Sequence, residues 1–214
     1  MQTSFSCFGR TSEEVANTLT HLIGIVFAFV TAYLLLTRCA EGSWQELFGM
    51  AVFSAAMLFM YTASTVYHWT LPGKDKRVLR YFDHICIYVL IAGSYTPIWL
   101  CVVGGTWGWV AFGLMWGVAV AGAIGKLVAL GKHPRLSLTI YLVMGWSAVF
   151  AVVPIWKAMS ATSLLWLLAE GFFYSSGTYF YAHDDKRPFF HAVWHLFVLG
   201  GTVSHSMALW TLMA

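Results

Sequence analysis

Three histidines and an aspartate stand out in a sequence that is otherwise strongly apolar. His191 and His195 lie four residues apart in FFHAVWHLF, and side chains at that spacing share one face of a helix. A third imidazole, His68, ends the stretch STVYH, and Asp83 lies in YFDHICIY. Three imidazoles suit a tetrahedral Zn²⁺ whose fourth position is left to water, and nitrogen ligands without thiolates also admit iron, nickel or copper.

Two further side chains predict how such a site would work. Asp83 would orient or deprotonate a metal-bound water, as carboxylates beside metal ions do. Ser64 precedes His68 by four residues, on the same predicted helix face, and could hydrogen-bond into the site. The alternative is that each histidine only packs or hydrogen-bonds inside the protein. We favour metal binding, because an H-x-x-x-H pair, a third histidine and an aspartate coincide.

The composition places these residues in a membrane protein. Of the 214 residues, 59% are hydrophobic and 10% are charged, and the mean hydropathy of +0.72 is far above that of soluble domains. A membrane-spanning helix needs about 20 apolar residues. The sequence therefore predicts an all-α membrane protein, a single domain over residues 1–214 that forms a seven-transmembrane helix bundle. The seven apolar stretches are residues 17–37, 45–69, 82–102, 107–130, 136–157, 162–182 and 189–212.

The basic residues predict how the bundle is oriented, because lysine and arginine accumulate on the cytoplasmic side of membrane proteins. Only Arg38 and Lys157 fall on the side away from the N-terminus. We therefore expect a cytoplasmic N-terminus and an external C-terminus. The net charge of +3 reflects these loops and does not indicate a nucleic-acid partner. The other ten basic residues are Arg10, Lys74, Lys76, Arg77, Arg80, Lys126, Lys132, Arg135, Lys186 and Arg187.

This topology brings the candidate site residues to one depth in the membrane. His68 ends the second stretch, Asp83 opens the third, and His191 and His195 open the seventh, all at the cytoplasmic end. The topology depends on lysine and arginine alone, so it supports the site independently of the histidines. Ionisable groups within the bilayer are costly, and they usually face the bundle interior, where they pair or bind a ligand.

A second polar cluster opens the first stretch in SEEVANTLTHLIG, where Glu14, Asn17 and His21 share one predicted face. Helix capping, with Ser12 as the N-cap, accounts for the acidic first turn. It does not account for Asn17 and His21, which we expect to pack against the polar centre. His205, deep in the last stretch, is predicted to be a buried hydrogen-bonding residue.

Other features predict packing. Gly113, Gly117 and Ala121 form a ridge of small residues, which is typical of close helix contact in membranes. Pro97 and Pro154 lie inside apolar stretches, where we expect them to kink the helices.

The motifs occur in a fixed order: E-x-x-N-x-x-x-H from residue 14, S-x-x-x-H from residue 64, FDH with AGSYTP, and H-x-x-x-H followed by GGTVSH. This combination resembles the hemolysin III family, the bacterial branch of the progestin and adipoQ receptor superfamily, over essentially the whole chain. The resemblance implies a seven-helix bundle, unrelated in sequence to G-protein-coupled receptors, with zinc near the cytoplasmic face. It implies His68, His191 and His195 as ligands, and Asp83 and Ser64 as the residues that hold or activate the zinc-bound water.

Two functions are compatible with this resemblance. The first is a zinc-dependent hydrolase of a lipid amide or ester in membrane-lipid homeostasis, similar to the alkaline ceramidases. The second is a non-enzymatic membrane sensor or receptor-like protein, in which a structural zinc joins the second helix to the seventh. A pore-forming haemolysin fits poorly, because the outer halves of the helices are nearly all apolar. We expect membrane lipids as partners and a multi-pass location in a bacterial inner (plasma) membrane.

Overall fold

The computed structural model describes residues 9–128 and 134–213. The regular elements in these ranges are all helices. Two of them are not α-helical: η1 is a π-helix and η2 is a 3₁₀-helix. In chain order the elements are α1 (Ser12–Arg38), α2 (Trp44–Trp69), α3 (Lys74–Pro97), η1 (Ile98–Val103), α4 (Gly105–Val128), α5 (Pro134–Gly145), η2 (Ser147–Ala151), α6 (Val152–Ala158), α7 (Ala161–Tyr181) and α8 (Phe190–Leu212).

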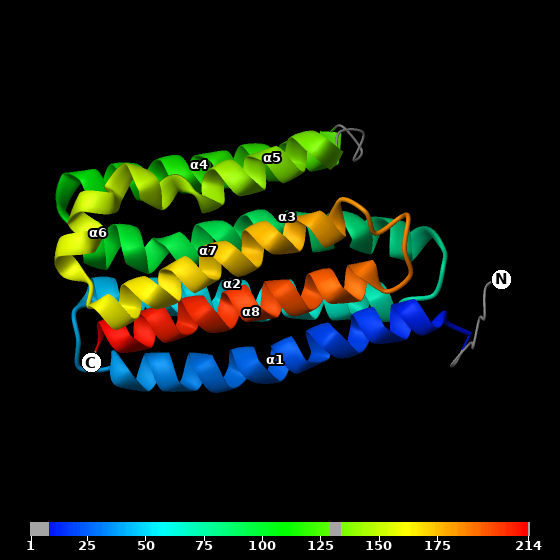
Figure 1. Ribbon diagram of the computed structural model, residues 1–214, viewed down its shortest axis with the longest axis horizontal. Helices are drawn as coiled ribbons and strands as arrows, with labels where there is room; N and C mark the ends of the chain where they lie inside the picture. Colours follow the sequence, from blue (N-terminus) through cyan, green and yellow to red (C-terminus); the bar gives the residue numbers. More distant parts are fainter. Residues whose placement is uncertain (1–8, 129–133, 214) are drawn as a thin grey trace.

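The axes of the long helices are nearly aligned, and the two chain termini lie at opposite ends of the bundle (Figure 1). Each predicted apolar stretch coincides with one helix or with consecutive helices, since η1 continues α3 and η2 joins α5 to α6. The end of the predicted fourth stretch, beyond Val128, and Lys132 lie outside the described residues. The prediction of an all-helical protein is confirmed.

Six helical segments in the described part of the chain are long and apolar enough to cross a membrane. They are Ser12–Arg38, Trp44–Trp69, Lys74–Val103, Gly105–Val128, Arg135–Ala158 and Phe190–Leu212. The helix α7 is not among these six; its sequence contains Glu170 and is rich in serine, threonine and tyrosine. The length and composition of the helices therefore establish a multi-pass membrane protein with six candidate spans.

The N-terminus of α1 is capped one residue earlier than the sequence suggested. The Thr11 side chain accepts a hydrogen bond from the Glu14 backbone N–H at 3.3 Å, so Thr11 is the N-cap and the prediction of Ser12 was wrong. A threonine hydroxyl fulfils the same role as a serine hydroxyl there, because either can satisfy a free N–H of the first turn.

The two prolines lie beside departures from regular α-helix. Pro97 ends α3, and the next six residues form the π-helix η1. Pro154 lies in α6, directly after the 3₁₀-helix η2. Proline removes one backbone donor and its ring presses on the carbonyl of residue i−4. For Pro154 that residue is Phe150 in η2, so this irregularity has a local cause in the sequence, whereas for Pro97 it is Gly93 in regular α3.

Small residues pack closely in the bundle, but not where the sequence predicted. A Cβ atom added at Gly113 or Gly117 would meet nothing within 4 Å, so the predicted ridge on α4 makes no close contact at either glycine. A close contact on α4 is made by the nearby Gly122, where an added Cβ would lie 2.4 Å from the Tyr88 ring. On α1, a Cβ at Gly24 would lie 2.3 Å from the Tyr61 ring, which fixes how closely α1 approaches α2.

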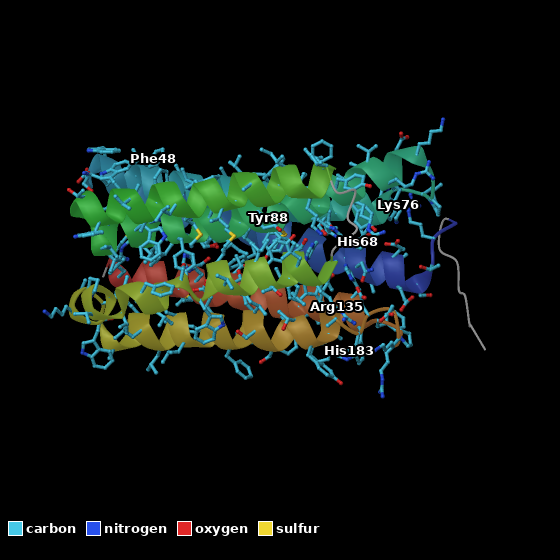
Figure 2. All side chains as sticks on the ribbon, turned by 90° about the horizontal axis from the view of Figure 1, so that it is seen from above. Phe48, His68, Lys76, Tyr88, Arg135 and His183 are labelled. Carbon is cyan, nitrogen blue, oxygen red and sulfur yellow. The ribbon has the colours of Figure 1, made fainter. Side chains whose placement is uncertain are left out.

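Figure 2 shows where the polar side chains gather along the bundle. His68, Lys76, Arg135 and His183 lie toward the end that carries the N-terminus of α1, whereas Phe48 lies toward the other end and Tyr88 between them. The last turn of α2 and the first turns of α1 and α8 therefore meet at one end of the molecule, and they carry the candidate site.

Candidate metal centre

The structure brings His68, His191 and His195 together from α2 and α8. One ligand atom from each side chain lies within 4.8 Å of the other two, and the ring centroids are 4.6–5.0 Å apart. His68 and His195 are buried, at 3% and 2% exposure, and His191 is half-buried. Spacings of this size let three imidazoles converge on one ion.

The His68 ring is held from its far side by α1. Its Nδ1 lies 2.6 Å from Glu14 Oε2, and the other carboxylate oxygen of Glu14 accepts a hydrogen bond from Lys76 Nζ at 2.5 Å. An ionised carboxylate only accepts hydrogen bonds, so Nδ1 carries the proton and Nε2 is left as the coordinating atom. That Nε2 atom is buried and has no hydrogen-bond partner in the described part of the chain.

The two histidines of α8 are anchored in the same way. His191 Nδ1 lies 2.7 Å from Asp184 Oδ2, in the loop before α8. His195 Nδ1 lies 3.2 Å from the carbonyl oxygen of Asn17 and 3.0 Å from the hydroxyl of Thr20, both on α1. Histidines that bind metals usually donate their second ring N–H to a carboxylate or carbonyl, which fixes the tautomer. All three rings have this arrangement, so the residues fit a metal ion.

His21 forms a further layer behind the cluster. Its ring stacks on His195, with the centroids 3.6 Å apart and the planes 20° apart, and its edge meets Tyr61. Both ring nitrogens of His21 are buried without a hydrogen-bond partner among the described residues. His21 therefore packs against the polar centre, although its nitrogens lie outside the group of converging ligand atoms.

Ser64 and Asp83 reach the same centre from α2 and α3. Both line one cavity together with His191 and His195. The Ser64 hydroxyl is fully buried and has no hydrogen-bond partner in the described part of the chain, and Asp83 is 8% exposed. A carboxylate and an uncommitted hydroxyl thus border the space beside the histidines.

The cavity that they line is about 410 Å³ in volume and mostly apolar. Its walls come mainly from α3, α5, η2, α6, α7 and α8, with further residues from α1, α2 and η1. It extends from Asp83 on α3 to Ile98 at the start of η1, a separation of fifteen residues that corresponds to about 22 Å at 1.5 Å per residue. One leaflet of the hydrocarbon core measures about 15 Å, so the cavity is long enough to hold an extended acyl chain.

A separate polar vestibule of about 170 Å³ lies at the end of the bundle. It is lined by Thr11, Glu13, Glu14, Asn17, Asp184, Phe189 and His191. His191 borders both the vestibule and the apolar cavity, so its side chain lies between a polar space and an apolar one.

The start of α8 is tied to α1 beside this vestibule. Phe189, the N-cap of α8, has φ 61°, and its backbone N–H donates to Glu13 Oε1 at 2.6 Å. A left-handed conformation is unusual for a bulky residue and needs support from its surroundings. The Glu13 contact supplies that support, two residues before His191.

Comparison with known proteins identifies the family to which the chain belongs. A family model described as "Haemolysin-III related" matches residues 10–206. The chain belongs to the haemolysin-III-related family. Within this family it is similar to the hemolysin-3 homolog of Bacillus subtilis (strain 168), with 38% identity over 90% of both chains. It is also similar to hemolysin-3 of Bacillus cereus, with 34% identity over 89% of this chain and 87% of the relative.

A human relative extends this haemolysin-III-related family beyond bacteria. The monocyte to macrophage differentiation factor of Homo sapiens is 31% identical over 92% of this chain and 83% of its own length. The match extends over most of the chain and is not confined to one part of the bundle.

Three partners of the cluster were missed in the sequence: Glu14, Asp184 and Thr20. Helix capping accounts for Glu14 in the sequence, although its spacing to Asn17 and His21 places it on the polar face. Asp184 lies in the loop HDDKRP, whose charges predict only the topology. Thr20 directly precedes His21 and had no distinguishing pattern.

Proposed function

We propose that this protein is a membrane-embedded, zinc-dependent hydrolase that cleaves an amide or ester bond of a membrane lipid. The observation that carries the proposal is the convergence of three anchored histidines at the polar end of a long apolar cavity. His68, His191 and His195 would hold the ion through Nε2. Bound Zn²⁺ would supply Lewis acidity and a nucleophilic water at neutral pH.

The chain's own residues would then carry the proton. Asp83 borders the cavity beside the histidines and would accept a proton from the attacking water as the new C–O bond forms. The same carboxyl group would return that proton to the nitrogen or oxygen of the leaving group as the scissile bond breaks. The Ser64 hydroxyl is uncommitted and would donate a hydrogen bond to the reacting oxygen.

The cavity supports a lipid as the substrate class. Its walls are mostly apolar over about 22 Å, which suits an acyl chain with its carbonyl group at the histidines. The polar vestibule lies on the other side of His191, where a polar head group or leaving group could face water.

A second candidate function is a sensor in which zinc is structural. The ion would join the last turn of α2 to the first turns of α8, and Glu14 would connect α2 to α1. A structural zinc site is closed by four protein ligands, whereas a catalytic site leaves one position for water. Three histidines converge here among the described residues, which favours the hydrolase.

The Asp83→Asn variant separates the two functions. Under the hydrolase proposal it folds and carries about one Zn²⁺ per chain, but it loses lipid turnover and fails to complement a deletion strain. His195→Ala loses most of the zinc, and Asp185→Asn, in the exposed loop before α8, serves as the control with full zinc and full complementation. An Asp83→Asn protein that binds zinc and complements fully would overturn the hydrolase assignment and leave the sensor.

The same proposal includes seven spans in a bacterial inner membrane, with the N-terminus in the cytoplasm. The helix α7 has 21 residues and runs alongside α8 within the bundle (Figure 1). Its Glu170 is paired with His205, which lowers the cost of placing a carboxylate in the membrane. A reporter fused after residue 214 is expected to be active only outside the cytoplasm, and cytoplasmic activity would contradict the orientation.

A further inference from the structure

Glu170 on α7 and His205 on α8 form a second ionisable pair that faces the apolar cavity. Glu170 Oε2 lies 2.8 Å from His205 Nδ1, and both residues line the cavity at a distance from the histidine cluster. His205 is 2% exposed, as expected for the buried hydrogen-bonding residue predicted from the sequence. Ionisable side chains inside a membrane-spanning bundle are costly, and they commonly mark a site that binds something.

The pair has hydrogen-bonding capacity that the described protein does not fill. With Nδ1–H donating to Glu170, the Nε2 atom of His205 is an acceptor, and it is buried without a partner in the described ranges. In the same ranges the second carboxylate oxygen, Glu170 Oε1, makes no hydrogen bond. Because His205 Nε2 is itself buried, a ligand in the cavity that carries a hydroxyl or an amine would meet the pair at Glu170 Oε1.

The hydroxyl groups of Tyr61, Tyr95, Tyr174 and Thr202 already have partners of their own. Thr202 donates to the Val198 carbonyl and accepts from Tyr61 at 2.9 Å and from Tyr174 at 3.0 Å. The Tyr95 hydroxyl donates to the Gly145 carbonyl. None of these four hydroxyl groups donates to Glu170 or His205, which leaves the carboxylate open to a donor carried by a molecule in the cavity.

The separation of the two polar sites sets where that donor lies on the ligand. His195 and His205 are ten residues apart on α8, which corresponds to about 15 Å along the helix axis. An extended acyl chain advances about 1.2 Å per bond. The value is taken from an extended polypeptide, whose rise per residue covers three backbone bonds. A group that reaches Glu170 from a carbonyl at the histidines is thus about twelve bonds away.

We propose that Glu170 and His205 bind a hydroxyl group carried on the acyl chain of the lipid substrate. The assignment rests on the proposed function, because it takes the carbonyl group to lie at the histidine cluster. A hydroxyl is favoured over an ammonium because the surrounding walls are apolar, and a neutral donor enters such a cavity at lower desolvation cost. The protein would then select lipids hydroxylated near the twelfth carbon of the chain.

Binding of free fatty acids to the zinc-loaded full-length protein in detergent tests this selection. Their carboxylate stands in for the acid that hydrolysis releases, and Trp146, Trp156 and Trp194 line the cavity and report binding by fluorescence. We expect 12-hydroxyoctadecanoic acid to bind about tenfold more tightly than octadecanoic acid, since hydrogen bonds to charged groups are the stronger ones. The 6-hydroxy isomer is expected to gain nothing, because its hydroxyl falls short of Glu170.

The matched variant replaces both members of the pair, Glu170→Leu with His205→Phe, so that neither is left unpaired in the membrane. It is expected to bind both acids equally, with zinc content and unfolding temperature as checks on folding. Glu170→Gln, which keeps the shape but loses the charge, is expected to reduce the preference severalfold. Thr178→Val, at another point of the cavity wall, is expected to keep the full preference.

The outcomes distinguish this inference from the proposed function. Equal affinity of the wild-type protein for both acids, or a preference that survives in the double variant, overturns the hydroxyl site and leaves the hydrolase standing. If the protein prefers only 12-aminooctadecanoic acid, the site binds an ammonium group and the proposed hydroxyl site is wrong. If neither fatty acid binds, the lipid cavity is wrong and the proposed hydrolase falls with it.

Discussion

Glu14 Oε2 lies 2.6 Å from His68 Nδ1, although the two residues are 54 positions apart and belong to different helices. Through this contact, α1 directly positions a candidate metal ligand of α2. Lys76, from the start of α3, donates to the other oxygen of the same carboxylate, so three helices meet at this group.

The Glu14→Gln variant should weaken metal binding without abolishing it. Partners that orient a ligand typically change metal affinity by about 10- to 100-fold, because they fix the tautomer and raise the basicity of the imidazole. Competition with a zinc chelator measures the change in the purified protein. Glu46→Gln is the control, since Glu46 caps α2 at the opposite end of the bundle and should leave the affinity unchanged. An unchanged affinity in Glu14→Gln would contradict the assigned role.

Asp184→Asn should weaken zinc binding by a similar factor through His191. The Asp184 carboxylate lies 2.7 Å from His191 Nδ1, and an asparagine there still accepts a hydrogen bond but has lost its charge. The adjacent Asp185 is exposed and provides a matched control with the same change of charge. If Asp184→Asn and Asp185→Asn affect zinc affinity equally, the effect comes from the general loop charge and not from the hydrogen bond.

The histidine cluster could be predicted from the sequence because regular rules govern it. Helix periodicity places His191 and His195 on one face, and the distribution of lysine and arginine brings His68 to the same end of the bundle. The pairing of Glu14 with His68 has no such rule. It depends on the rotation and closeness of α1 against α2, which the contact between Gly24 and the Tyr61 ring sets in three dimensions.

The other features that the sequence did not predict correctly have the same origin. Asp184 lies in a loop, where no periodicity fixes the direction of a side chain, so its contact with His191 could not be inferred. The ridge on α4 had the right residue types for close packing, but Gly113 and Gly117 face open space in the structure. A local pattern shows which surfaces can pack closely, whereas the arrangement of the whole bundle decides which of them do.

The Gly24→Ala substitution should destabilise the bundle, and Gly113→Ala should not. A Cβ at Gly24 would lie 2.3 Å from the Tyr61 ring, whose hydroxyl is fixed on Thr202, so the ring has little room to move. Overpacking of this kind costs about 1–3 kcal/mol. A Cβ at Gly113 meets nothing within 4 Å, and alanine favours the helix there. Thermal unfolding in detergent compares the two, and equal midpoints would show that α1 can move away from α2.

Removal of the metal should destabilise the wild-type protein and leave His191→Ala nearly unaffected. A ligand that binds only the folded state stabilises it in proportion to the logarithm of its concentration over Kd, by about 4 kcal/mol at a thousandfold excess. For a chain of this size, that loss corresponds to a fall of about 8–16 °C in Tm.

His191 is the least buried of the three ligands, so its replacement by alanine removes a ligand with the least loss of packing. We therefore expect a chelator to lower the Tm of the wild-type protein to near that of His191→Ala. The Tm of His191→Ala itself should not change when the chelator is added. An equal fall in both proteins would place the stabilising metal outside this cluster, because a variant that has lost a ligand should have no such contribution left to lose.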